Sequence, residues 1–136
     1  MGLLDRLRRR RPTPVVALDP ADPLLVVLLE ARDAARADSE VLAGVDLDRP
    51  LLVRHLLVGL PDEAAVARAA ELLGQDGYAV LPAPIGAPLA VHASRTQVLT
   101  ALSASQERSR MAGLAQRLGG DVAGYDVLGI RDSHPS

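Results

Sequence analysis

Two histidines are the first residues of this 136-residue sequence that could do chemistry. His55 and His92 each lie in a stretch that predicts a β-strand, so their imidazoles could meet on one face of a sheet. A metal site or an acid–base pair needs further groups close by, and no HxH, HxxxH or His–carboxylate pattern accompanies either residue. We therefore interpret both as partly exposed strand histidines. They are candidates for an interface and, because histidine titrates near neutrality, for pH sensing.

The remaining polar patterns do not assemble an active site. Asp46 and Asp48 form a DxD pair, but hard metal ions take about six oxygen ligands. The glycine pair at 119–120 precedes a predicted strand, so it cannot present the amide groups of a helix start to a phosphate. The serines between residues 103 and 109 have no His or Asp partner nearby in the sequence. The sequence thus predicts a protein that is not an enzyme, with no metal and no cofactor.

The composition excludes several classes of function. Without cysteine, the chain has no disulfides, zinc fingers or thiol catalysis. The formal net charge of −2 argues against a generally basic nucleic-acid binder, and the chain has only two Phe, Tyr or Trp rings for base stacking, Tyr78 and Tyr125. Hydrophobic residues make up 49% of the sequence, which is enough for a core at this length. We expect a small cytoplasmic protein with no sequence-specific nucleic-acid partner.

The N-terminus differs from the rest of the chain in charge. Residues 1–11 carry five arginines and one aspartate, whereas the remaining residues have an excess of acids. Leucines come first in this segment, followed by an arginine run made up of Arg8, Arg9, Arg10 and Arg11. This order is the reverse of that in a signal peptide, and we expect residues 1–19 to form a basic tail and linker. The run is a candidate for peripheral contact with an anionic membrane or with RNA phosphates, and a solvated tail is the alternative.

Hydrophobic periodicity predicts one α+β domain over residues 20–130, followed by a frayed C-terminus at 131–136. An apolar pattern at helical spacing, with Asp22 as its cap, predicts a helix over 21–37. The predicted elements that follow are strand 51–60, helix 62–76, strands 78–81 and 89–93, helix 100–118 and strand 121–130. The two later helices each have a single apolar stripe, so both should cover one face of an antiparallel sheet. This is the ferredoxin-like β-α-β-β-α-β arrangement, with an extra N-terminal helix.

Two details concern the ends and bends of these elements. Ser103, with Gln106 three residues later, is a candidate capping box for the last helix. Gly124 lies inside the last predicted strand, where glycine is typical of a bulge or kink. We therefore expect that strand to be irregular near its middle.

Three segments of the sequence together match the pattern of one known family. They are residues 47–55 (LDRPLLVRH), 77–80 (GYAV) and 107–126 (ERSRMAGLAQRLGGDVAGYD). In this order they resemble the lead into the first strand, the start of the second strand, and the final helix and strand of the regulators of ribonuclease E activity B. The resemblance spans about residues 24–130. It implies a ferredoxin-like fold and a non-catalytic protein that binds a ribonuclease and restrains it.

Tyr125 stands where that family more usually has tryptophan. It could be an exposed interface anchor, or it could pack on the helix that ends at Leu118 with its hydroxyl in water, which we favour. The sequence predicts regulation by protein–protein binding, with a ribonuclease as partner and a candidate interface at Tyr125, His55 and His92. The alternatives are a small-molecule-sensing module, by analogy of fold alone, and a structural homodimer joined through sheet faces or edges.

Overall fold

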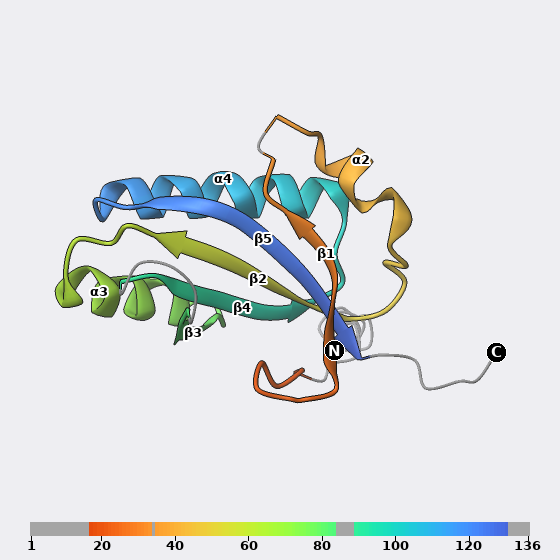
Figure 1. The fold of residues 1–136 in the computed structure, drawn as a ribbon, viewed down its shortest axis with the longest axis horizontal. Coiled ribbons are helices and arrows are strands. Elements are labelled where there is room, and N and C mark those ends of the chain that lie inside the picture. Colours follow the sequence, from red (N-terminus) through yellow and green to blue (C-terminus); the bar gives the residue numbers. More distant parts are fainter. Residues whose placement is uncertain (1–16, 34, 84–88, 131–136) are drawn as a thin grey trace, which may run out of the picture.

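The computed structural model describes residues 17–33, 35–83 and 89–130. Within them the chain is α+β, as the sequence predicts (Figure 1). Its elements in chain order are β1 (Leu25–Ala31), α2 (Asp38–Val41), the 3-10 turn η1 (Leu42–Gly44), β2 (Leu51–Val58), α3 (Glu63–Gly74), β3 (Ala79–Pro82), β4 (Val91–Gln97), α4 (Ala101–Arg117) and β5 (Asp121–Ile130). None of the helices in these residues is both long and apolar enough to cross a membrane.

The five strands form one antiparallel sheet in the order β1-β5-β2-β4-β3. β2 lies at its centre and pairs with β5 on one side and β4 on the other. Along the pairing with β5, Arg54 lies opposite Asp126 and His55 lies opposite Tyr125. Because successive strand residues point to opposite faces, this register sends Arg54 and His55 to different sides of the sheet.

The predicted helix over 21–37 is wrong. Residues Leu25–Ala31 instead form β1, an edge strand that pairs with β5. Its sequence, LVVLLEA, is a short continuous apolar run, and periodicity does not separate strand from helix in such a run. Asp22, the expected cap, accepts a hydrogen bond from the backbone amide of Leu24 (2.8 Å) and closes a turn before the strand. A strand at this place gains a hydrogen-bonded ladder with β5, which decides the outcome.

Side-chain caps fix the starts of the two long helices. Asp62 accepts a hydrogen bond from the amide of Ala65 (2.8 Å) at the start of α3. At the start of α4 the cap is Thr100, and the hydroxyls of Thr100 and Ser103 each accept from the other residue's amide at 3.0 Å. The predicted capping box of Ser103 and Gln106 is therefore wrong. Thr100 already offers a hydroxyl where the extended backbone turns into helix, so the box forms one turn earlier.

The last strand is irregular at Gly124, as the sequence predicts. Gly124 has a φ of +122°, and the register with β2 shifts between Leu56 and Leu57 opposite it. A Cβ added at Gly124 would lie 2.0 Å from the carbonyl oxygen of Ala31. Glycine therefore allows β5 to pass directly against the end of β1.

The helices α3 and α4 share a hydrophobic core with the sheet. Leu73 of α3, Met111 of α4 and Leu57 of β2 are fully buried in one cluster. A second cluster, which includes Val53 and Tyr125, continues the core under the first turns of α4 and is closed by η1. Burial of each large side chain stabilises the fold by about 1.5–3 kcal/mol. The core therefore fixes α4, the element that carries Glu107 and Arg108 of the polar groups described next.

Candidate functional site

Among the described residues, three buried carboxylates come from three different elements: Asp38 of α2, Glu107 of α4 and Asp126 of β5. Removing a charge from water is costly unless the charge is paired and hydrogen-bonded, so polar groups have to converge on each of them. Each carboxylate does meet an arginine. We call the three groups the Asp38, Glu107 and Asp126 clusters.

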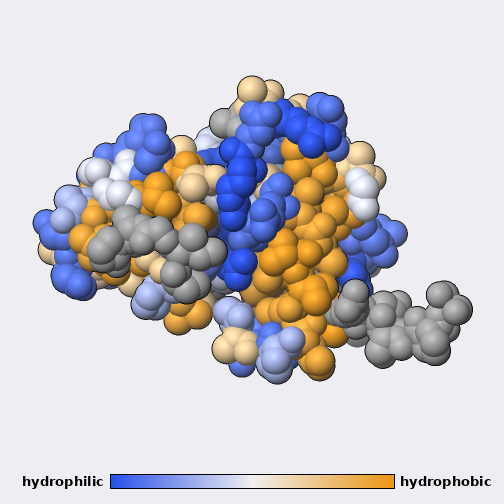
Figure 2. Space-filling model, in the orientation of Figure 1, coloured by the Kyte–Doolittle hydropathy of each residue, from blue (hydrophilic) through white to orange (hydrophobic). Residues whose placement is uncertain are grey.

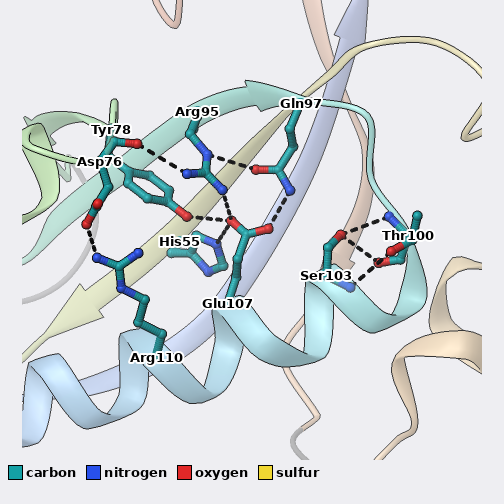
Figure 3. A network of polar contacts seen from close by, with 9 residues as sticks. All are labelled: His55, Asp76, Tyr78, Arg95, Gln97, Thr100, Ser103, Glu107 and Arg110. Atoms are coloured by element: carbon teal, nitrogen blue, oxygen red, sulfur yellow. Dashed lines mark hydrogen bonds and ion pairs between the residues drawn. The ribbon is translucent and has the colours of Figure 1, made fainter. Parts of the chain in front are cut away.

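The Glu107 cluster joins α4 to β4 and to the segment before β3 (Figure 3). One carboxylate oxygen of Glu107 accepts from the hydroxyl of Tyr78 (2.5 Å) and from Nη2 of Arg95 (3.2 Å), and the other accepts from the amide of Gln97. Arg95 also donates to the carbonyl oxygen of Asp76 (3.2 Å). Its guanidinium lies 4.4 Å from the centre of the Tyr78 ring, at cation–π distance. These contacts tie the middle of α4 to the sheet.

His55 completes the interior side of this cluster. Its side chain is 1% exposed, and Nε2 lies 3.6 Å from the Glu107 carboxylate, beyond direct hydrogen-bond distance. The ring contacts those of Tyr78 and Tyr125 at centroid distances of 6.2 and 5.8 Å. The expectation of a partly exposed histidine is therefore wrong here. The register of β2 turns position 55 toward the helices, where α4 covers it.

The Glu107 carboxylate is held in its ionised form. Burial raises its pKa, but His55, the Gln97 amide and the Tyr78 hydroxyl all favour the charged form and together lower the pKa to about 2. Burial, and next the hydrogen bond to Glu107, raise the pKa of Tyr78 well above its ordinary value. Neither group exchanges a proton near neutral pH, so the cluster acts as a clamp and not as an acid–base pair.

The Asp126 cluster lies on the other face of the sheet. Arg32 holds one oxygen of Asp126 at 2.6 Å, and Arg54 holds the other through Nη2 at 2.8 Å and Nε at 3.0 Å. His92 is half-buried on β4, two strands away from Asp126. Burial, and next the charge of Arg54, lower the pKa of His92. Both effects favour the neutral form of His92, and it remains the one predicted interface histidine that reaches the surface.

The Asp38 cluster accounts for Tyr125. The Tyr125 hydroxyl donates to one oxygen of Asp38 (2.7 Å), and Arg108 of α4 binds the other oxygen at 3.0 Å. Tyr125 is 1% exposed, so its hydroxyl is buried and does not lie in water as the favoured interpretation expected. Burial, and next the hydrogen bond to Asp38, raise the pKa of Tyr125 above its ordinary value. The cluster holds α2 against β5 and α4.

The predicted site residues therefore separate into three groups. His55 and Tyr125 are near neighbours in the interior. Because both side chains are buried, they can affect a partner only by positioning the surface residues around them. His92 lies on the opposite face and does not join them. The run Arg8–Arg11 lies outside the described residues. An interface role for any of these residues stays a prediction.

The arrangement offers structural support and no assembled reaction centre within the described residues. No group of three or more His, Cys, Asp or Glu side chains there is placed to hold a metal ion. Ser103 is engaged in the cap of α4 through Thr100. Each buried carboxylate is already bonded to a guanidinium, which leaves it no free role as a base.

Sequence reasoning did not select the three carboxylates, although signals for them exist. Glu107 occupies a position on the apolar stripe of α4, four residues before Met111 and seven before Leu114. Arg54 and Asp126 are opposite charges inside two strand sequences made up mainly of apolar residues. A charge at a core-facing position predicts a buried partner of opposite charge elsewhere, and this would have been the signal to follow.

The comparisons with known proteins add one finding to this geometry. A family model described as regulator of ribonuclease activity B matches residues 37–127. The match runs from the residue before α2 into β5, so it includes Asp38, Glu107 and Asp126. No curated protein and no solved structure gives a significant match to the chain.

Proposed function

The chain belongs to the regulator of ribonuclease activity B family, and on that premise we propose that it restrains a ribonuclease of the ribonuclease E type by binding to it. The family match covers two-thirds of the chain and includes all three buried carboxylates, whereas Arg32, one partner of Asp126, lies before it. Regulation of a ribonuclease by a partner needs a surface that is held in one shape, and it needs no reacting groups of the regulator's own.

The observation that carries this proposal is that the three buried carboxylates hold elements of the fold together. Glu107 clamps α4 to the sheet, Asp38 clamps α2 to α4, and Asp126 joins β5 to Arg32 and Arg54. Each buried carboxylate is bonded to a guanidinium, whereas neither ring nitrogen of His55 has a hydrogen-bond partner within the described residues. Bonded polar networks of this kind favour one rigid arrangement over others. The ionisable side chains that could have served chemistry therefore serve to fix the outer surface.

The exposed surface favours a protein partner over RNA. Figure 2 shows a broad hydrophobic area over β1 and the end of β5, beside a hydrophilic strip. In this region the exposed aliphatic side chains are Leu24 (64%), Val27 (44%) and Leu28 (37%). Contiguous exposed apolar surface is typical of protein–protein contact, and both described tyrosines are buried and unavailable to stack on bases.

The proposal extends to the topology and to the N-terminus. We propose that α3, α4 and the strands β5-β2-β4-β3 form a ferredoxin-like unit with both helices on one face, to which β1 adds a fifth strand. The element order from β2 onward and the core shared by α3 and α4 support this interpretation. We also propose a cytoplasmic protein whose arginine run, Arg8–Arg11, contacts anionic surfaces.

A titration of ribonuclease activity tests the proposed function. The initial rate of cleavage of a fluorogenic single-stranded RNA by a ribonuclease E-type enzyme should fall and level off as this protein is added. The protein alone should leave the RNA intact and should not retain it in a filter-binding control. A rate that does not change, or one that falls only because the protein binds the RNA, would overturn the proposal.

A further inference from the structure

The outer surfaces of α3 and α4 enclose a groove with a volume of about 400 Å³. It is lined by one stripe from each helix and its C-terminal end: Arg68, Leu72, Gln75 and Asp76, and Arg110, Leu114, Arg117 and Leu118. Both stripes follow the spacing i, i+4, i+7, i+8, which places their side chains along one line of a helix. The groove thus runs between two parallel rows of side chains and is open to solvent.

The floor of the groove is aliphatic. Leu72 and Leu118 are half-buried and border the core, and Leu114 beneath them is 6% exposed. Leucine side chains that stay partly exposed between two helices gain free energy when a further apolar side chain covers them.

The rim of the groove is positively charged. Three arginines line it against one aspartate, although the chain as a whole has a formal net charge of −2. Arg110 pairs with Asp76 across the groove, as Figure 3 shows, and Arg68 pairs with Glu71 at 3.1 Å. Arg117 is exposed and has no ion pair within the described residues. With these two pairs formed, the rim keeps one net positive charge, at Arg117, and this charge can meet a carboxylate of a partner.

Two other occupants fit this groove less well. Residues 1–16 of the chain carry five arginines and one aspartate, so their charge does not complement the rim. RNA would satisfy the arginines, but it would leave the leucine floor uncovered, and no aromatic ring lines the groove for a base to stack on.

We infer that the α3–α4 groove docks an acidic segment of the partner protein, which places an apolar side chain on Leu72 and Leu118 and carboxylates against Arg68 and Arg117. This inference rests on the proposed function, because the acidic segment belongs to the ribonuclease. It adds where on this protein the segment binds and which side chains bind it. The leucine floor would supply burial, and the arginines would supply attraction and orientation.

Binding of labelled peptides tests this surface directly. The probe is a short fluorescein-labelled peptide with leucines at helical spacing and glutamates between them, and a matched peptide carries lysines in place of the glutamates. In the full chain, the double variant Arg68→Glu/Arg117→Glu should bind the glutamate peptide at least about tenfold more weakly. Arg36→Glu is the control for charge reversal away from the groove, because Arg36 is as exposed as Arg68 (53% against 55%) and is also paired locally. It should bind as the wild type does.

Further measurements keep the result interpretable. Thermal unfolding confirms that each variant is folded, and Arg68→Gln/Arg117→Gln replaces the double reversal if that variant is not. Unchanged peptide binding in a folded double variant, equal binding of the lysine peptide, or groove-dependent binding of a short single-stranded RNA alone would overturn the inference.

Ribonuclease titrations with the same variants separate the two proposals. A wild type that binds the peptide but leaves the ribonuclease active contradicts only the proposed function. A groove variant that restrains the ribonuclease as strongly as the wild type does contradicts only the inference that the ribonuclease docks in the groove.

Discussion

Glu107 is the residue on which most of the buried polar contacts depend. Its two oxygens accept hydrogen bonds from Tyr78, Arg95 and Gln97, and Nε2 of His55 lies 3.6 Å from one of them on the interior side. A carboxylate that accepts several hydrogen bonds stabilises the folded state more when it is ionised than when it is protonated. Its contribution to stability should therefore depend on pH in a defined range.

The first prediction concerns that range. The pKa of Glu107 falls from 4.5 to about 2 on folding, so as pH drops the unfolded chain takes up this proton before the folded chain does. The stabilisation is complete above pH 4.5 and is lost as the pH falls through about 2. Its full size is on the order of 3 kcal/mol. Urea unfolding should show a shallower loss of stability between pH 4.5 and pH 2 in Glu107→Gln than in the wild type.

A loop aspartate provides the control for this measurement. Asp48 is exposed and makes no ion pair within the described part of the chain, so Asp48→Asn should follow the wild-type pH dependence. Parallel curves for Glu107→Gln and the wild type over the same range would show that the carboxylate is not clamped in solution.

At this scale the sequence predicted which residues are unusual better than it predicted their surroundings. His55 and Tyr125 were singled out from the sequence, but both were expected nearer to solvent, and their burial depends on partners distant in the chain. Tyr78 and Arg95 reach Glu107 across sequence separations of 29 and 12 residues, and Tyr125 reaches Asp38 across 87. Such pairs follow from strand register and helix placement, which no local pattern of residues specifies.

Among the elements, β1 and β5 depend on each other at one position. Gly124 has a positive φ, and its backbone passes directly beside the carbonyl group of Ala31. A side chain there would meet backbone, which cannot move aside as a flexible side chain can. The close approach of β5 to the end of β1 at this position therefore requires glycine.

The second prediction follows from that contact. Gly124→Ala should lower the free energy of unfolding by more than about 2 kcal/mol, because it combines an unfavourable φ with a backbone clash. Gly113→Ala is the matched control, since Gly113 lies inside α4 with no atom within 4 Å of an added Cβ. It should raise stability by about 0.5–1 kcal/mol because alanine is the better helix former. Equal midpoints in chemical unfolding for Gly124→Ala and the wild type would show that β1 does not pair with β5 here.

The elements themselves were predicted unevenly. The helix that α4 forms has an apolar pattern at helical spacing, and the strand over 121–130 follows a glycine stop and is rich in apolar residues. Both were located correctly. The segment Leu25–Ala31 was not, because seven consecutive residues with five aliphatic ones at the start fit either structure. Pairing with the edge of β5 favours the strand over the helix in this segment. A local sequence pattern cannot show this, because that edge exists only once the sheet has formed.

For the whole molecule, the basic N-terminus is a property separate from the domain surface. The third prediction is that deletion of residues 1–11, which carry five arginines, weakens binding to anionic vesicles. Each basic residue near such a membrane contributes about 1 kcal/mol, and the effect should shrink as salt is added. Co-sedimentation with phosphatidylserine vesicles measures it, and neutral vesicles are the control. Equal retention of the full and shortened chains on anionic vesicles would exclude this contact.

We propose that this protein regulates the ribonuclease by forming a complex with it. Sedimentation velocity of this protein mixed with a ribonuclease E-type enzyme, without RNA, tests it most directly. A new, faster boundary containing both proteins is the expected result, and it should weaken in the Arg68→Glu/Arg117→Glu variant but persist in Arg36→Glu. Two boundaries that sediment as the separate proteins do, at concentrations where the enzyme is fully restrained, would contradict the claim.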